Sequence, residues 1–142
     1  MIFVDTGAWI ALTDASDALN AEAVAIYRHI VASRLQLLTT DYVLDETITR
    51  LRYDAGHSAA LKFVDHVYAA QRKGVIQILH IDTGLFADAV VIFRKYADTV
   101  LSLTDCTSFA VCKRYGISSV FGFDRHYAMM SFSLLVAPQQ NR

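Results

Sequence analysis

The sequence predicts an α/β fold, with a central parallel sheet of about five strands and helices on both of its faces. Short apolar runs rich in strand-forming residues alternate with longer segments whose apolar residues recur at helical spacing. Apolar residues make up 54% of the 142 residues and charged residues 19%, so disorder is excluded and a packed core is expected. One proline and six glycines leave room for few linkers. This length fits one domain over residues 1–137, followed by a short frayed tail over 138–142.

The first strand is predicted over residues 2–4 and leads directly into Asp5. A buried strand with a carboxylate after its last residue is typical of open α/β sheets, which bind ligands outside the carboxyl ends of their strands. Gly7 is expected to let the chain turn out of the sheet. One or two helical turns are expected over residues 8–12.

The middle of the chain, from residue 20 to residue 96, is predicted to contain four helices and two strands. The helices are placed by their apolar periodicity and by residues that commonly cap a helix start. The expected caps are Asn20, Thr40 or Asp41, Ser58, and Asp82 with Thr83. The expected strands cover residues 35–39 and 75–81. Gly56 and Gly74 are expected to end the helices that precede them.

The last third of the chain is predicted to hold one long helix and two strands. Thr104 is the expected cap of the helix, which ends at Gly116. A strand over residues 118–121 then leads to Asp124, which could itself cap a short helix. A final strand over residues 132–136 is expected at an edge of the sheet.

Composition narrows the classes of function. The net charge of −1 provides no basic excess, so any nucleic-acid binding must come from a local patch or from metal ions.

Cys106 and Cys112 are six residues apart in a predicted helix, about 9 Å along its axis, which is too far for a disulfide. Free thiols fit a reducing cytosol. No signal peptide and no membrane span are expected, so a cytoplasmic protein is predicted.

One alternative function comes from a repeated tripeptide. Asp-Thr-Gly occurs at residues 5–7 and again at 82–84, and two such motifs resemble a two-lobed aspartic protease. However, aspartic proteases are nearly all β, whereas each motif here leads into sequence with helical periodicity. Asp82 and Thr83 are better explained as a helix start. The protease interpretation is therefore rejected.

Four acids are placed where a parallel sheet would gather them. Asp5 and Asp124 follow predicted strands, whereas Glu46 and Asp105 lie in the first turns of predicted helices. Each could have an ordinary role alone, as a loop residue, a solvated helix residue or a helix cap. Together they would repel one another unless a cation neutralised them. Hard oxygen ligands select Mg²⁺ or Mn²⁺, ions that activate water toward phosphodiesters.

The acids lie in stretches that resemble a known family. These stretches are Ile2-Phe3-Val4-Asp5-Thr6, Glu46 after the second strand, Leu101-Ser102-Leu103-Thr104-Asp105-Cys106-Thr107-Ser108-Phe109-Ala110, and Phe121-Gly122-Phe123-Asp124-Arg125-His126-Tyr127. In this order they resemble the PIN domain over essentially the whole chain, and above all the VapC-like ribonucleases, which include toxins of type II toxin–antitoxin pairs. Many relatives carry a hydroxyl residue just before the last acid, where Gly122 and Phe123 stand here.

The resemblance implies a metal-dependent endoribonuclease that leaves a 5′-phosphate and a 3′-hydroxyl. Asp5 and Asp105 would be the main ligands of Mg²⁺ or Mn²⁺, and Glu46 and Asp124 would complete the site. The supporting hydroxyls would be those of Thr6, Ser102 and Thr104. The resemblance also implies an RNA substrate, a cognate antitoxin and a homodimer.

Basic residues are the candidate contacts to RNA. Arg125 and His126 follow the last acid, and a phosphate contact is preferred for His126 over a role as general base. Four further candidates are equally well explained as residues of solvated helix faces: Arg50, Arg52, Lys113 and Arg114.

Two other functions stay open from the sequence. A haloacid-dehalogenase-type phosphatase also places an aspartate after its first strand, but it needs a second aspartate two residues later, where Gly7 stands. A non-catalytic PIN scaffold could bind RNA or protein. The presence of all four acids argues against the scaffold.

Overall fold

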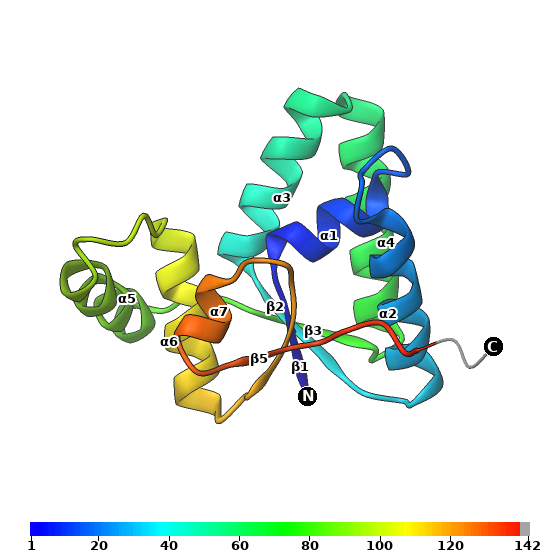
Figure 1. The fold of residues 1–142 in the computed structure, drawn as a ribbon. Helices are drawn as coiled ribbons and strands as arrows, with labels where there is room; N and C mark the ends of the chain where they lie inside the picture. Colours follow the sequence, from blue (N-terminus) through cyan, green and yellow to red (C-terminus); the bar gives the residue numbers. More distant parts are fainter. Residues whose placement is uncertain (140–142) are drawn as a thin grey trace.

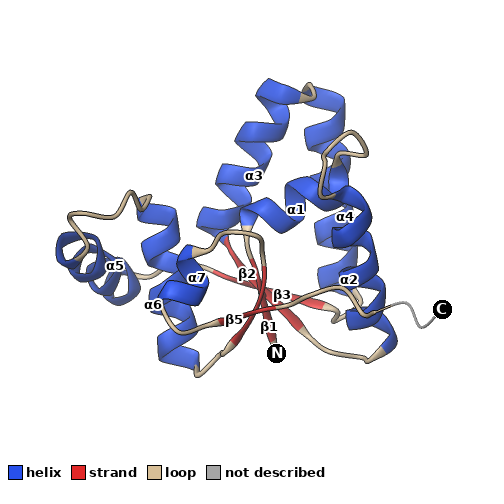
Figure 2. Ribbon diagram, in the orientation of Figure 1, coloured by secondary structure: helices blue, strands red, loops and turns tan. Residues whose placement is uncertain are grey.

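Five parallel strands form the centre of the molecule, which the computed structural model describes over residues 1–139. Their order is β3-β2-β1-β4-β5, with β1 in the middle. The strands are β1 (Ile2–Val4), β2 (Leu37–Thr40), β3 (Ile76–Leu79), β4 (Ser119–Phe121) and β5 (Ser133–Leu134). Figure 2 shows them crossing the centre of the molecule between the helices. The predicted parallel sheet is confirmed, with β5 at an edge as expected, although most strands are shorter than the apolar runs suggested.

Helices cover both faces of the sheet, as predicted. They are α1 (Thr6–Thr13), α2 (Asn20–Ala32), α3 (Asp41–Asp54), α4 (His57–Arg72), α5 (Thr83–Lys95), α6 (Leu103–Tyr115) and α7 (His126–Met129). In Figure 1, α2 and α4 lie on one side of the strands and α6 and α7 on the other. The α3–α4 pair extends beyond the sheet.

Pairing of β1 with β4 determines what lies beside Asp5. Phe3 is in register with Val120, and Val4 with Phe121. The backbone N–H of Asp5 then donates to the carbonyl of Phe121 at 3.0 Å. All three residues of β1 are buried. The first acid is therefore held at the centre of the sheet, next to the segment that carries the last one.

Two predicted helix caps are confirmed. Thr40 Oγ1 accepts a hydrogen bond from the N–H of Val43 at 3.1 Å, and Asp82 Oδ1 accepts one from the N–H of Leu85 at 2.8 Å. These bonds satisfy N–H groups that have no partner within the first helical turn.

Three other helix starts were predicted wrongly. Helix α2 begins at Asn20 itself, whose side-chain amide donates to the carbonyl of Ala11 at 2.8 Å instead of capping the helix. Helix α4 begins after Gly56, whose φ of 94° few other residues adopt, and Ser58 lies inside the helix. Helix α6 is capped by Ser102 and not by Thr104, because Ser102 pairs with Asp105 in a reciprocal capping box.

Gly7 does not form a turn, contrary to expectation. It lies in the first turn of α1, and it is absent from the residues with positive φ. The change of direction after β1 occurs instead at Asp5, whose extended backbone (φ −93°, ψ 164°) leads directly into the helix. Helix α1 is accordingly longer than the predicted residues 8–12.

Most long helices bury one face in the core, whereas α6 is buried on all sides over residues 106–112. In α4, Ala60, Phe63 and Val67 are buried, whereas Leu61 and Tyr68 point outward and are about half exposed. Both cysteines are free, as predicted, and both are buried. Among residues 1–139, none of the helices is long and apolar enough to cross a membrane.

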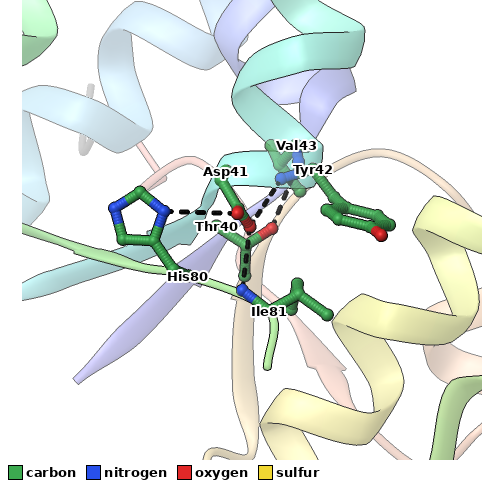
Figure 3. Close-up of polar contacts among 6 residues, drawn as sticks. All are labelled: Thr40, Asp41, Tyr42, Val43, His80 and Ile81. Carbon is green, nitrogen blue, oxygen red and sulfur yellow. Dashed lines mark hydrogen bonds and ion pairs between the residues drawn. The ribbon is translucent and has the colours of Figure 1, made fainter. Parts of the chain in front are cut away.

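Asp41 connects the start of α3 to the chain beyond β3 (Figure 3). Its Oδ1 accepts hydrogen bonds from the N–H groups of Tyr42 and Ile81, each at 3.0 Å. Its Oδ2 lies 3.2 Å from Nδ1 of the exposed His80. One carboxylate thus satisfies two backbone donors on separate elements at the carboxyl edge of the sheet.

We expect Asp41→Ala to lower the free energy of unfolding by about 1–3 kcal/mol, because it leaves backbone donors without their acceptor. The matched control is Asp45→Ala, which removes an exposed carboxylate from the same helix and should change stability by less than about 0.5 kcal/mol. Urea unfolding at pH 7 measures both. Equal losses in the two variants would mean that the Asp41 contacts contribute nothing.

Candidate functional site

The predicted acids lie around the carboxyl edge of the sheet. Asp5 directly follows β1, and Asp124 lies three residues beyond β4. Glu46 is in the second turn of α3, and Asp105 is in the first turn of α6. In Figure 1 the starts of α1 and α3 meet at this edge, with α7 nearby. The topology therefore directs four chain segments that are distant in sequence toward one region.

Asp5 is the buried member of the group. It is only 6% exposed, and burial raises the pKa of its carboxyl from 3.8 to about 7. The Tyr127 hydroxyl and the backbone N–H of Thr6 lower this pKa, whereas the negative charges of Asp105 and Glu46 raise it further. An ionised Asp5 is thus unfavourable without a compensating positive charge.

Asp105 is fixed by the capping box of α6. Its Oδ2 accepts a hydrogen bond from the backbone N–H of Ser102 at 2.9 Å, while its own N–H donates to Ser102 Oγ at 3.0 Å. The rigid start of α6 therefore determines the position of this carboxylate. The other oxygen, Oδ1, takes no part in the box and is available to bind another group.

Glu46 and Asp124 have partners of their own. Glu46 is half-buried and lies 4.0 Å from the guanidinium of Arg50, one turn later in α3. Asp124 Oδ1 accepts a hydrogen bond from the backbone N–H of His126 at 2.9 Å and lies 2.9 Å from Nδ1 of the same residue. Both carboxylates are partly exposed and partly committed to a neighbouring basic side chain.

The structure brings three of the acids within electrostatic reach of one another, because Asp105 and Glu46 both act on the pKa of Asp5. Over residues 1–139, no three His, Cys, Asp or Glu side chains converge closely enough to hold one metal ion as they stand. Like-charged carboxylates repel, which favours side-chain conformations that keep them apart.

The chemistry of the site nevertheless fits a hard divalent cation. Its donors are carboxylate and hydroxyl oxygens, which Mg²⁺ and Mn²⁺ prefer. Thr6 Oγ1, adjacent to Asp5, is buried and has no hydrogen-bond partner among the described residues. A buried carboxyl with a raised pKa and an unsatisfied hydroxyl beside it are both stabilised by a cation and its water ligands.

The other predicted hydroxyls have backbone roles. Ser102 caps α6, as described above. The carbonyl oxygen of Thr104 accepts hydrogen bonds from Thr107 Oγ1 at 2.7 Å and from Ser108 Oγ at 3.1 Å. Thr104 therefore helps to order the first turns of α6 through its backbone carbonyl.

The basic candidates divide into two groups. Arg114 is held by two acids of the α5 region, at 3.5 Å from Asp82 and 2.8 Å from Asp88, so it fastens α6 to α5. Arg125 is exposed beside the last acid. Arg50, Arg52 and Lys113 are likewise exposed. Arg114 is exposed as well, but it is committed to these two acids, and Arg50 lies 4.0 Å from Glu46, so Arg52, Lys113 and Arg125 have the side chains most available for a ligand.

Two residues of the site were missed by the sequence analysis. Gly122 lies against Asp5: a Cβ at this position would be 3.2 Å from Asp5 Cβ. Tyr127 is completely buried, and its hydroxyl lies beside Asp5. The β1–β4 register brings this segment to the first strand, and no spacing within the sequence reveals it. One signal in the sequence could have pointed to Gly122. It is one of the two residues that stand where many relatives carry a hydroxyl residue before the last acid.

Comparison with known proteins identifies the family. The model of the PIN domain matches residues 2–132, which is most of the chain. The chain belongs to the PIN domain family. The VapC-like assignment made from the sequence is confirmed by a relative from Mycobacterium tuberculosis described as a 23S rRNA-specific endonuclease, VapC20, which is 33% identical over 132 residues. That alignment covers 93% of this chain and 95% of the relative.

One further relative and two solved structures are similar to this PIN domain. A VapC ribonuclease from Archaeoglobus fulgidus is 26% identical, with 89% of this chain and 78% of the relative covered. The crystal structure of M. tuberculosis VapC20, described as a sarcin–ricin loop cleaving toxin, superposes with a TM-score of 0.82 at 32% identity, covering 96% and 99% of the two chains. FitAcB from Neisseria gonorrhoeae has the same fold, with a TM-score of 0.62 at 13% identity and coverage of 95% and 96%.

The PIN domain also contains an apolar cavity of about 740 Å³, away from the acids. It lies between α1, α2, α4 and the strands β2 and β3, and residues that line it include Trp9, Tyr27, Phe63 and Val67. None of the four acids lines it. The candidate active site is therefore identified by charge, burial and topology, and not by cavity size.

Proposed function

We propose that this PIN domain, residues 1–137, is a Mg²⁺- or Mn²⁺-dependent endoribonuclease and the toxin of a type II toxin–antitoxin pair. The observation that carries the proposal is the buried Asp5 carboxyl, which lies at the carboxyl edge of the sheet with Asp105 and Glu46 within electrostatic reach. Like charges concentrated in a poorly solvated place require a cation, and phosphodiester hydrolysis uses one.

The four acids have distinct roles in this proposal. Asp5 and Asp105 are the main ligands, because one is desolvated and the other is fixed by the α6 capping box. Glu46 and Asp124 complete the site, directly or through water. Thr6, Ser102 and Thr104 orient the carboxylates or bound water. These residues would hold a divalent cation, which would supply polarisation of the phosphate and a lowered pKa of a water molecule.

The substrate is proposed to be RNA held near Arg125 and His126. Arg125 is exposed, and His126 lies next to Asp124, which supports a role for both in contacting phosphates of the RNA. The net charge of −1 makes such local contacts necessary. Because the M. tuberculosis relative is described as cleaving the sarcin–ricin loop of 23S rRNA, this loop is the first substrate to test.

The proposed setting is the cytoplasm, with a cognate antitoxin and a second copy of the chain as partners. The supporting observation is the description of the VapC20 structure as that of a toxin. Expression of the chain alone should arrest growth. Coexpression of a protein encoded beside it should restore growth if that protein is the antitoxin.

The activity is tested with purified protein freed of any inhibitor. We expect cleavage of a sarcin–ricin loop RNA in Mg²⁺ or Mn²⁺, no cleavage in EDTA, and products that carry a 5′-phosphate and a 3′-hydroxyl. RNA binding without cleavage in either metal would instead identify a non-catalytic scaffold. A phosphorylated aspartate after incubation with a phosphate ester would identify a phosphatase.

Gly122 provides a prediction about how closely Asp5 is packed. In Gly122→Ala the new methyl group meets Asp5 Cβ at 3.2 Å, so the carboxylate must shift by a few tenths of an ångström. We expect kcat/KM for RNA to fall about tenfold, since catalysis is sensitive to small displacements of the reacting groups. Single-turnover cleavage assays measure the effect.

The matched control for Gly122→Ala is Gly7→Ala. No atom lies within 4 Å of a Cβ at Gly7, which is helical, so this variant should raise the free energy of unfolding by about 0.5–1 kcal/mol. If Gly122→Ala retains full activity, the catalytic position of the Asp5 carboxylate does not depend on this close contact.

A further inference from the structure

Tyr127 is the largest side chain that is completely buried, and three aromatic rings fix its position. Its ring lies 6.5 Å from Phe3 of β1, 5.0 Å from Phe109 of α6 and 6.2 Å from Phe132, measured between ring centroids. These contacts come from three separate parts of the chain. The ring therefore has little freedom, and the location of its hydroxyl is determined by the core.

The hydroxyl at the end of this ring lies in a small polar region behind the candidate site. It is buried and has no hydrogen bond of standard geometry with any of the described residues. The groups near enough to act on the pKa of this hydroxyl are the Asp5 carboxyl, the Ser108 hydroxyl and the Cys112 thiol. The phenol of a tyrosine carries its proton at neutral pH, so this buried group can act as a donor.

Asp5 is the best acceptor for this proton. The hydroxyl of Ser108 donates its single proton to the carbonyl oxygen of Thr104 at 3.1 Å, so toward Tyr127 it can act only as a neutral acceptor. The Cys112 thiol is a weak hydrogen-bonding group. An ionised carboxylate forms shorter and stronger hydrogen bonds than either.

A purely structural aromatic residue would not need this hydroxyl. Phenylalanine would fill the same space among Phe3, Phe109 and Phe132 and would leave no buried donor without a partner. An unsatisfied buried hydroxyl destabilises the folded chain, and such groups concentrate where they serve a function. The Tyr127 hydroxyl is thus explained by what it can do for Asp5.

We propose that Tyr127 is a positioning residue that donates its hydroxyl proton to one oxygen of the Asp5 carboxylate, so that the other oxygen faces a bound divalent cation. This inference rests on the proposed function, because it assumes that Asp5 is a metal ligand. Residues that orient a metal ligand typically change metal affinity or activity 10–100-fold when they are replaced. The fixed ring supplies the rigidity that such orientation requires.

The test compares Tyr127→Phe with the wild type and with Asp5→Asn. Mn²⁺ affinity is measured without RNA, from the loss of the free-ion signal in electron paramagnetic resonance. We expect Tyr127→Phe to weaken Mn²⁺ binding about tenfold and to raise the Mg²⁺ concentration that half-saturates RNA cleavage by a similar factor. Tyr27→Phe is the matched control, because it makes the same chemical change in a half-buried tyrosine that lines the apolar cavity.

A double-mutant cycle separates positioning from general stability. In EDTA, the thermal midpoint of Tyr127→Phe should be no lower than that of the wild type. Adding Tyr127→Phe to the Asp5→Asn background should cause no further loss of Mn²⁺ affinity, because the hydroxyl acts through Asp5. An additional tenfold loss in that background would overturn the proposal.

The two proposals fail in different ways. If the wild type binds no Mn²⁺, the metal-dependent function is wrong and the role of Tyr127 falls with it. If the wild type binds Mn²⁺, Asp5→Asn binds it much more weakly, and Tyr127→Phe binds as tightly as the wild type, the function stands and the positioning role is wrong. A lowered thermal midpoint with unchanged metal affinity would likewise make Tyr127 a core residue only.

Discussion

Replacing Asp5 by asparagine is expected to reduce RNA cleavage by at least about 10³-fold and, at the same time, to stabilise the metal-free protein above pH 7. The loss of activity follows from the proposed role, because a metal site contributes several kcal/mol of transition-state stabilisation. Asparagine has nearly the same shape but no negative charge. The fold should therefore persist while the affinity for Mg²⁺ or Mn²⁺ falls far below that of the wild type.

The gain in stability follows from the raised pKa of Asp5. Burial moves this pKa from 3.8 to about 7, so the folded protein binds a proton that the unfolded chain has lost between these two values. Stability of the metal-free wild type must then fall as pH rises from about 4 to about 7, and the full penalty remains above pH 7. Asp5→Asn lacks this penalty.

The measurement is urea unfolding in EDTA at pH 5 and at pH 8. Asp5→Asn should exceed the wild type in stability by more at pH 8 than at pH 5, and added Mg²⁺ should stabilise only the wild type. Asp98→Asn, the same change at an exposed acid, is the control and should alter neither activity nor the pH dependence. A wild type that is more stable than Asp5→Asn at pH 8 in EDTA would contradict the assignment of an ionised, uncompensated Asp5.

Local sequence patterns were sufficient for the architecture and for the position of Asp5. An apolar triplet followed by an acid identified β1, and alternation with helical segments identified a parallel, doubly covered sheet. Element ends were less predictable, because they depend on competition between neighbouring groups. Ser102 and Thr104 both carry hydroxyls suited to capping α6, and the choice was decided by Asp105, three residues after Ser102.

The environment of Asp5 could not be predicted in the same way. Gly122 and Tyr127 lie more than a hundred residues along the chain from Asp5, and only the pairing of β1 with β4 brings them together. The sequence placed Tyr127 beside a short helix and assigned it no role. Its burial results from packing among Phe3, Phe109 and Phe132. These residues belong to separate parts of the chain, so the apolar spacing within one helix or strand does not reveal that they meet.

Asp105 is predicted to combine a structural role with a chemical one, and two substitutions separate them. In the wild type the backbone N–H of Ser102 donates to Asp105 Oδ2 at 2.9 Å. Asp105→Asn removes the negative charge but keeps an oxygen that can accept this hydrogen bond. Asp105→Ala removes both. We therefore expect each variant to lose RNA cleavage by about 10²–10³-fold, because each lacks the proposed metal ligand.

Stability distinguishes the two Asp105 variants. The free energy of unfolding should fall by about 1 kcal/mol in Asp105→Ala, which loses half of the capping box. Asp105→Asn should be at least as stable as the wild type in EDTA, since it relieves repulsion with Asp5. Urea unfolding and cleavage assays on the same preparations measure both effects. If Asp105→Asn cleaves RNA at the wild-type rate, Asp105 serves only to start α6, and the cation must be held by Asp5 with other ligands.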